Sequence, residues 1–338
     1  MELQTQKTRV AWLSVCSNTT LVSLKLIVGL LIGSVSVISE AIHSGVDLLA
    51  AIIALFAVRH SGKPADDHHP YGHGKFENIS GTIEALLIFL AAIWIVWESI
   101  HKLLKPAPVE AVGWGIGIML GSAVLNTIVS EMLFRVGRKT DSKALEADGW
   151  HLRTDVWTSA GVALALTAML IGRRIAPQAD LRWLDPAAAM VVALLILRAA
   201  YHLTVESARD LLDVSLPQEE EAWIRDYIRR LAPRVCGFHH FRSRKSGHQR
   251  FVDLHLLVDA HMSVEESHEL AEEVEHVVEE RFPHANVTVH VEPCHGQCEG
   301  ECPTGCILGE DEREMVRIEL AREHAARQLA EGGTKIER

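Results

Sequence analysis

The chain contains 338 residues, of which 48% are hydrophobic and 23% are charged, and its formal net charge is −11 at pH 7. Acidic side chains crowd the C-terminal third, at residues 218–221, 265–280 and 310–331, where they would repel nucleic acid and attract cations. The composition is typical of an apolar part joined to a charged, soluble part, and it argues against a nucleic-acid partner.

Six runs are long and apolar enough to cross about 30 Å of hydrocarbon, which takes roughly 20 residues per helix. They lie at about residues 10–32, 36–58, 79–100, 112–134, 146–171 and 184–203. The first run follows Lys7 and Arg9, but it is longer than the apolar core of a secretory signal, so we interpret it as retained. The chain is predicted to be a multi-pass membrane protein with an all-α transmembrane domain over residues 1–213.

The distribution of basic residues predicts the orientation of the spans. The loops at 1–9, 59–78 and 135–153 carry ten lysines and arginines, whereas the loops on the opposite side carry five. Positively charged loops stay in the cytoplasm as a rule. We therefore expect both termini to be cytoplasmic and the protein to reside in the cell (inner or plasma) membrane.

Two of the predicted spans contain a histidine and an aspartate four residues apart, His43 with Asp47 and His151 with Asp155. This spacing puts both side chains of a pair on one helix face. Ionisable residues inside a span are costly, so they indicate function by default. A single pair is explained as well by an interhelical hydrogen bond. Two copies on two spans favour four convergent ligands for a tetrahedral divalent metal ion.

The chemistry of these four side chains favours zinc. Zn²⁺ prefers tetrahedral imidazole and carboxylate ligands, and two aspartates would bring the loaded site close to neutrality. Imidazole also favours Zn²⁺, and by extension Cd²⁺, over Mg²⁺ and Ca²⁺. Because histidine must be deprotonated to bind a metal, we expect protons to exchange with it as the counter-ion. The ligand types alone leave Zn²⁺, Cd²⁺, Co²⁺, Ni²⁺ and Fe²⁺ open.

The loop after the second span reads Asp-Asp-His-His-Pro-Tyr-Gly-His-Gly-Lys over residues 66–75. Its clustered aspartates and histidines at a membrane boundary predict a second metal site or a place that recruits ions. The alternative is a polar turn shaped by Pro70, Gly72 and Gly74.

The pattern beyond the spans predicts a soluble α+β domain over residues 214–293. Its expected elements are a helix at 218–231, strands at 235–247 and 250–259, an amphipathic helix at 263–282 and a strand at 285–292. This α-β-β-α-β order implies one sheet covered by helices. Several potential ligands fall on or beside these elements: His239, His240, His255, His268, His290 and Glu292.

The remaining residues, 294–338, are predicted to form a cysteine-rich tail followed by a solvated helix over 309–331. Four cysteines recur every four residues: Cys294, Cys298, Cys302 and Cys306. In a cytosolic tail these should be reduced thiols, which could hold one soft metal ion. A redox-sensitive clip and a glycine-rich tether with incidental cysteines are the alternatives, because C-x3-C repeats are looser than paired C-x2-C motifs.

These features together resemble the cation diffusion facilitator family of metal/proton antiporters. The resemblance rests on six spans, the two His-x3-Asp pairs, the loop at 66–75 and the soluble domain, and it covers roughly residues 5–293. It implies a homodimer in the lipid bilayer, in which each protomer alternately exposes His43, Asp47, His151 and Asp155 to the two sides. The histidine at position 43 of span two resembles that of the family's zinc-type members. The soluble domain should be ferredoxin-like and dimerise.

The resemblance also implies further site residues. Asp66, His69 and His73 match the family's loop-borne metal site, with His68 as an additional neighbour. Lys75 and Asp213 match a lysine and an acidic residue that pair at the membrane surface and tie the protomers together. The cytosolic metal ligands would be His239, His255, His268, His290 and Glu292. Glu292 stands where the family often has aspartate, which puts the bridging geometry of a two-metal site in doubt.

Two other classes of function fit parts of the pattern. A membrane zinc metalloenzyme would use zinc-activated water, with Glu40 as the only nearby general base, but four protein ligands leave no open metal position. A metal sensor without transport would rely on the cytosolic histidines and the cysteine tail. The sequence favours a divalent metal efflux transporter, a secondary active transporter rather than an enzyme.

Overall fold

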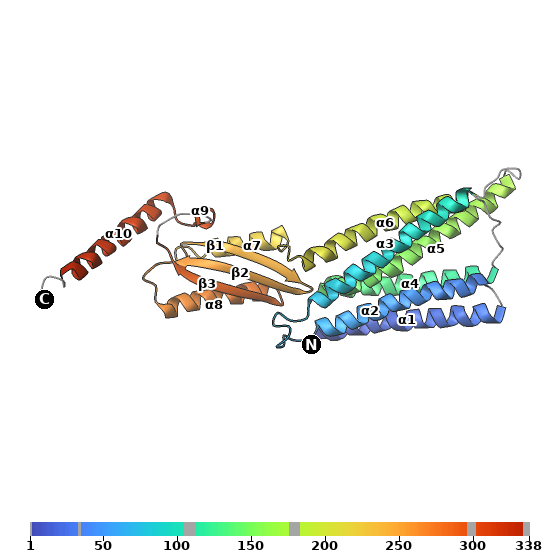
Figure 1. The fold of residues 1–338 in the computed structure, drawn as a ribbon, viewed down its shortest axis with the longest axis horizontal. Helices are drawn as coiled ribbons and strands as arrows, with labels where there is room; N and C mark the ends of the chain where they lie inside the picture. Colours follow the sequence, from blue (N-terminus) through green and yellow to red (C-terminus); the bar gives the residue numbers. More distant parts are fainter. Residues whose placement is uncertain (1, 33–34, 105–112, 176–182, 296–301, 334–338) are drawn as a thin grey trace. The chain divides into compact units, whose positions relative to one another are not determined.

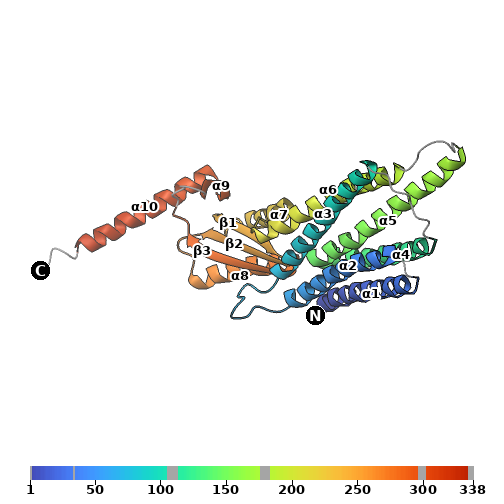
Figure 2. The same ribbon diagram turned by 45° about the vertical axis from the view of Figure 1, so that its right-hand side comes forward.

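A computed structural model describes residues 2–32, 35–104, 113–175, 183–295 and 302–333 of the chain. The chain divides into two compact units, residues 1–212 with 246–248 and residues 213–245 with 249–338. Each unit is described by itself below, and both are drawn in Figures 1 and 2.

The first unit is a bundle of long helices, one for each predicted span (Figure 1). They are α1 Glu2–Ile32, α2 Val35–Ser61, α3 Lys75–Leu104, α4 Gly113–Thr140, α5 Lys143–Ile175 and α6 Leu184–Leu211. At 1.5 Å per residue, a helix of 30 residues such as α3 is about 45 Å long, enough to cross hydrocarbon and reach beyond it. The predicted helical membrane domain is confirmed.

The exposed surface of these helices is apolar. Among the described residues, four segments have the length and hydropathy of a membrane span: Glu2–Val28, Ser44–Ser61, Lys75–His101 and Pro186–Leu211. On α3, for example, Leu90, Trp94 and Trp97 are all more than half exposed. Such a surface is unfavourable in water but matches the acyl chains of a bilayer, where every backbone group is already satisfied within its helix.

Small residues allow the helices to pack closely. Helix α3 packs along α6, α1 along α2 and α4 along α5, and α2 also contacts α5. Ala50, Ala51 and Ala54 of α2 are completely buried, so this helix presents a face of small side chains to the bundle interior. The contact between α2 and α5 is the one that positions the candidate site.

The second unit contains a three-stranded sheet with helices packed against it (Figure 2). Its main elements are α7 Gln218–Arg229, β1 Gly237–Ser246, β2 Gln249–Val258, α8 Val264–Arg281 and β3 Ala285–Pro293. The sheet order is β1-β2-β3, and β3 runs parallel to β2. The link between β1 and β2 is too short for a crossover, so these strands form a hairpin. The predicted α-β-β-α-β order is confirmed.

Period-two alternation on β2 separates the core from the opposite face. Val252, Leu254, Leu256 and Val258 are buried in a cluster that includes side chains of α7 and α8. The residues between them, including Asp253 and His255, therefore point to the other face of the sheet. His255 therefore lies on the face of the sheet opposite this core.

The cysteine-rich tail forms two further helices, α9 Cys302–Gly305 and α10 Glu310–Gly333. An isolated antiparallel bridge pairs Gly237, the first residue of β1, with Cys306. The amide of Ile307 donates a hydrogen bond of 2.9 Å to the carbonyl of Cys236. The tail is thus attached to the edge of the sheet.

Candidate metal sites

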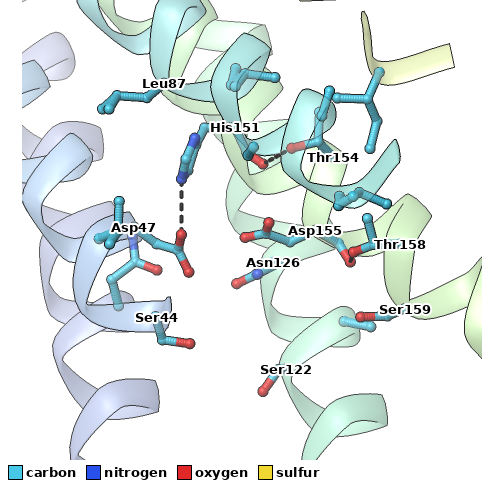
Figure 3. Close-up of a pocket in the computed structure, with 18 of the residues that line it drawn as sticks. Ser44, Asp47, Leu87, Ser122, Asn126, His151, Thr154, Asp155, Thr158 and Ser159 are labelled. Atoms are coloured by element: carbon cyan, nitrogen blue, oxygen red, sulfur yellow. Dashed lines mark hydrogen bonds and ion pairs between the residues drawn. The ribbon is translucent and has the colours of Figure 1, made fainter. Parts of the chain in front are cut away.

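The predicted pair on α5 meets the aspartate of α2 inside the helical bundle (Figure 3). Asp47, His151 and Asp155 each offer a ligand atom, and these atoms lie within 4.8 Å of one another. Nε2 of His151 is 3.0 Å from Oδ1 of Asp47, and both side chains are buried. Three of the four predicted ligands therefore converge on a space of the size that a metal ion needs.

The fourth predicted ligand, His43, precedes Asp47 by one helical turn on α2. Its side chain, like that of Glu40, lies outside the described residues, so its place in the site stays a prediction. The regular i, i+4 geometry of α2 keeps His43 on the helix face of Asp47.

A cavity of about 580 Å³ surrounds these ligands. This volume is far larger than the roughly 10–15 Å³ that one water molecule requires, so the site can hold a partly hydrated ion. Its walls carry polar side chains from several helices: Asn18, Lys25, Ser44, Ser122, Asn126, Thr154, Thr158 and Ser159.

The residues from α1 and α4 in this wall were not predicted as site residues. Lys25 is buried, and its ammonium donates a hydrogen bond of 2.7 Å to Ser44 across the contact between α1 and α2. Asn126 of α4 is also buried. The sequence does carry a signal for these wall residues, because Asn18, Lys25 and Asn126 interrupt apolar runs. Placing such polar side chains in a membrane span is costly unless they face a polar cavity.

The loop between α2 and α3 brings together Asp66, His69 and His73, the three residues that the sequence predicts. Nδ1 of His69 and Nε2 of His73 each lie 3.3 Å from a carboxylate oxygen of Asp66. His68 contributes its backbone amide, which donates to Asp66 over 3.0 Å. The hydrogen bond from the His69 amide lowers the pKa of Asp66, so this carboxylate is ionised at neutral pH.

The second unit holds a third cluster, centred on Glu292. Nε2 of His239 and Nδ1 of His255 each lie 2.9 Å from an oxygen of Glu292. The parallel register explains the arrangement, because it sets His255 opposite His290 and Leu257 opposite Glu292 on the neighbouring strand. Burial acts to raise the pKa of Glu292, but the hydrogen bonds from the two histidines outweigh it and lower that pKa.

Other predicted cytoplasmic ligands lie around this cluster. Nε2 of the exposed His290 is 3.5 Å from Glu292, and the ring of His240 lies 4.9 Å from that of His255. His268, on α8, lies 3.3 Å from Glu272 one turn further along the helix. The assignments of His268 and His290 as metal ligands stay predictions.

The remaining predicted residues are only partly described. Cys298 lies outside the described residues, as does the side chain of Cys302. Asp213 accepts a hydrogen bond of 3.4 Å from Arg244, and Lys75 is the first residue of α3. The predicted pairing of Lys75 with Asp213 stays a prediction.

The sequence matches two family models. The cation efflux transmembrane domain matches residues 11–212, and the cytoplasmic domain of cation efflux proteins matches residues 216–294. An uncharacterized transporter of Synechocystis is 35% identical over 283 residues, covering 84% of this chain and 89% of the relative. The cation-efflux pump FieF of Yersinia pestis is 36% identical over 283 residues, covering 82% of this chain and 91% of the relative.

Two solved structures are also similar to part of the chain. The Zn form of CzrB is 34% identical, with a TM-score of 0.24, and covers 25% of this chain and 97% of its own. The metal-bound C-terminal domain of the CzcD transporter from Thermotoga maritima is 28% identical, with a TM-score of 0.21, and covers 23% of this chain and 94% of its own. From the two family matches and the curated relatives, we conclude that the chain belongs to the cation diffusion facilitator family and is a multi-pass cation efflux transporter, not an enzyme.

Proposed function

We propose that this transporter is a homodimeric Zn²⁺/H⁺ antiporter that exports zinc, and also Cd²⁺, from the cytoplasm. The observation that carries the proposal is the convergence of Asp47, His151 and Asp155 within 4.8 Å of one another in a cavity of the helical bundle. Our proposal places His43 as the fourth ligand, from the turn of α2 before Asp47.

The ligand chemistry supports zinc as the substrate. An imidazole beside two carboxylates is a donor set that Zn²⁺ accepts at distances of about 2.0–2.2 Å. Mg²⁺ keeps several of its own waters and prefers oxygen ligands, so a buried imidazole disfavours it. A second histidine in the set strengthens this preference and extends it to Cd²⁺.

The contact between His151 and Asp47 supports the coupling to protons. The 3.0 Å contact joins a ring nitrogen to a carboxylate oxygen, so one of these two atoms must carry a proton. A metal ion bound to both atoms displaces that proton. Zinc and a proton therefore compete for the same two atoms, which is the requirement for exchange.

Alternating access follows if α2 and α5 move with their ligands between two bundle arrangements. Zinc enters from the cytoplasm, and protonation of the same side chains on the opposite side of the membrane helps to release it. The cytoplasmic domain joins two protomers, with both termini in the cytoplasm of the cell. Zinc on its Glu292 cluster would favour one dimer arrangement and thereby regulate the transport rate.

The test is Zn²⁺ uptake into proteoliposomes under an imposed pH gradient, for the native chain, Asp47→Ala and Asp155→Ala. Asp226→Ala, an exposed position on α7, is the matched control. We expect gradient-dependent flux in the native chain and the control, and none in the two site variants. Competition by Cd²⁺, Fe²⁺ and Mn²⁺ then ranks the substrates.

Two outcomes would contradict the proposal. Flux that persists in both site variants would place the transport site elsewhere. Transport of Fe²⁺ or Mn²⁺ with exclusion of Zn²⁺ would retain the membrane site but reject zinc as its substrate.

A further inference from the structure

The start of β1 and the ends of β2 and β3 lie together at one end of the cytoplasmic sheet. Cys236 precedes β1, Asp259 follows β2, and Cys294 follows β3. The amide of Cys236 donates to the carbonyl of Leu257 and the amide of Cys294 donates to the carbonyl of Val258, both over 2.8 Å. The two cysteines therefore flank the last residues of β2, one from each side.

The side chains of both cysteines line the same small cavity. Cys236 is buried, with 8% of its surface exposed. Cys294 is partly exposed. The backbone hydrogen bonds to β2 thus hold both cysteines at one end of the sheet, beside a common cavity.

A small cavity adjoins this pair. Its volume is about 20 Å³, and its potential ligands are Cys236, Asp259, His261, Cys294 and Glu319. A space of this size suits a single water molecule or metal ion. The amide of His261 donates to Oδ1 of Asp259 over 2.7 Å, and this short turn holds both residues at the end of β2.

We propose that Cys236 and Cys294, together with Asp259 and His261, form a separate metal site that takes a thiophilic divalent ion such as Zn²⁺ or Cd²⁺. Two thiolates, an imidazole and a carboxylate provide four donors for a tetrahedral ion. Thiolates favour Zn²⁺ and Cd²⁺ over Mg²⁺ and Ca²⁺. None of these four residues belongs to the Glu292 cluster, whose members are His239, His255 and Glu292.

The site also gives the C-terminal tail a role. Val316, Glu319 and Leu320 of α10 line the same cavity, and the tail is already hydrogen-bonded to the backbone of Cys236. An ion bound to the cysteine pair would lie between the end of the sheet and α10, and Glu319 would provide a further oxygen donor. Metal binding is therefore expected to hold α10 against this end of the sheet.

The pairing differs from a site made by the tail cysteines alone. A tail site would combine Cys294 with Cys298, Cys302 and Cys306, all within one short segment. The structure instead sets Cys294, which follows β3, near Cys236, which precedes β1 on the other side of β2. Cys236 is therefore the residue that distinguishes the two arrangements.

The experiment uses the full-length, reduced protein in detergent, with Cd²⁺ alone as the probe. Sulfur-to-cadmium charge transfer produces an ultraviolet absorption band, which carboxylate and imidazole ligands do not produce. The Glu292→Gln background weakens the histidine cluster, so that the titration reports on the thiols. Variants Cys236→Ser and Cys294→Ser are compared with Cys16→Ser, which changes an exposed cysteine of α1.

We expect a band at one Cd²⁺ per protomer that is retained in Cys16→Ser and lost in both Cys236→Ser and Cys294→Ser. Asp259→Asn should keep the band but weaken Cd²⁺ binding by about tenfold or more, because it replaces a charged oxygen ligand by a neutral one and even the loss of an outer-shell partner commonly costs 10–100-fold. Unchanged gel-filtration and circular-dichroism profiles of the variants show that the fold is intact. Absence of the band from the Glu292→Gln chain with all its cysteines intact overturns the proposal. Loss in Cys294→Ser but not in Cys236→Ser also overturns it, in favour of the tail cysteines.

Discussion

Nε2 of His151 and Oδ1 of Asp47 lie 3.0 Å apart, which joins α5 to α2 across 104 residues of sequence. Both side chains are almost completely buried. The two halves of the membrane site are therefore in direct contact, and any separation of α2 from α5 has to break this interaction. A change at either residue should affect metal binding and helix packing together.

His151→Gln tests the role of the imidazole. Glutamine can still hydrogen-bond to Asp47, but its amide neither titrates near neutral pH nor binds Zn²⁺ well. We expect the KM for Zn²⁺ to rise by at least about tenfold, since even the loss of a residue that only orients a ligand commonly costs 10–100-fold. Proteoliposome flux against zinc concentration measures this change. His202→Gln, at an exposed position of α6, is the control and should match the native chain.

Glu292→Gln tests the cytoplasmic cluster. Glutamine keeps the size of the side chain but removes the charge that His239 and His255 share. We expect one fewer tightly bound Zn²⁺ per protomer by calorimetry on the full-length protein. The transport rate should then follow occupancy of the membrane site alone, without a separate activation by zinc on the Glu292 cluster. Glu280→Gln makes the same chemical change at an exposed position of α8 and should have no effect. Full zinc occupancy in Glu292→Gln would exclude this residue as a ligand.

Asp66 and Asp67 provide a matched pair for the loop site. Asp66 contacts both His69 and His73, whereas the adjacent, exposed Asp67 is not part of this three-residue group. We expect Asp66→Asn to lose one bound Zn²⁺ per protomer and Asp67→Asn to keep it, as counted by equilibrium dialysis. Equal losses in the two variants would show that the loop attracts ions through its general charge instead of a defined site.

The ion pair between Arg234 and Glu273 predicts a pH dependence of the cytoplasmic unit. Nη1 and Nη2 of Arg234 lie 2.8 and 3.0 Å from the two carboxylate oxygens, and these hydrogen bonds lower the pKa of Glu273. A carboxylate with a lowered pKa stabilises the fold above the ordinary carboxyl pKa, and the contribution is lost as the pH falls through the lowered value. Both side chains are more than one-third exposed, so solvent screening limits the effect to about 0.5 kcal/mol.

Glu273→Gln is therefore expected to unfold at a lower urea concentration than the native chain at pH 7. The difference should shrink to zero as the pH falls below the lowered pKa of Glu273, because the native carboxyl is then neutral as well. Tryptophan fluorescence follows the unfolding, with Trp223 stacked on Tyr227 in this unit. A difference that is constant across this pH range would mean that Glu273 acts through packing and not through its charge.

Local patterns in the sequence predicted much of this protein. Long apolar runs predicted the membrane helices, and alternation of polar and apolar residues predicted the strands of the α-β-β-α-β domain. The i, i+4 spacing of His151 and Asp155 predicted that they share a helix face. These features depend on residues that are close in the chain, so the periodicity of a helix or strand is enough to reveal them.

The sequence also predicted that the two His-x3-Asp pairs converge, and the packing of α2 against α5 sets Asp47 beside His151. Only the tertiary structure decided contacts that no repeated motif links, such as the contact of α1 with α2 that places Lys25 in the cavity wall. The pairing of three strands brings Cys236 and Cys294 to the two sides of the end of β2, although the sequence had grouped Cys294 with the tail. Such contacts depend on helix crossing and strand register, which arise from many side chains packing together and leave no periodic signal in the chain.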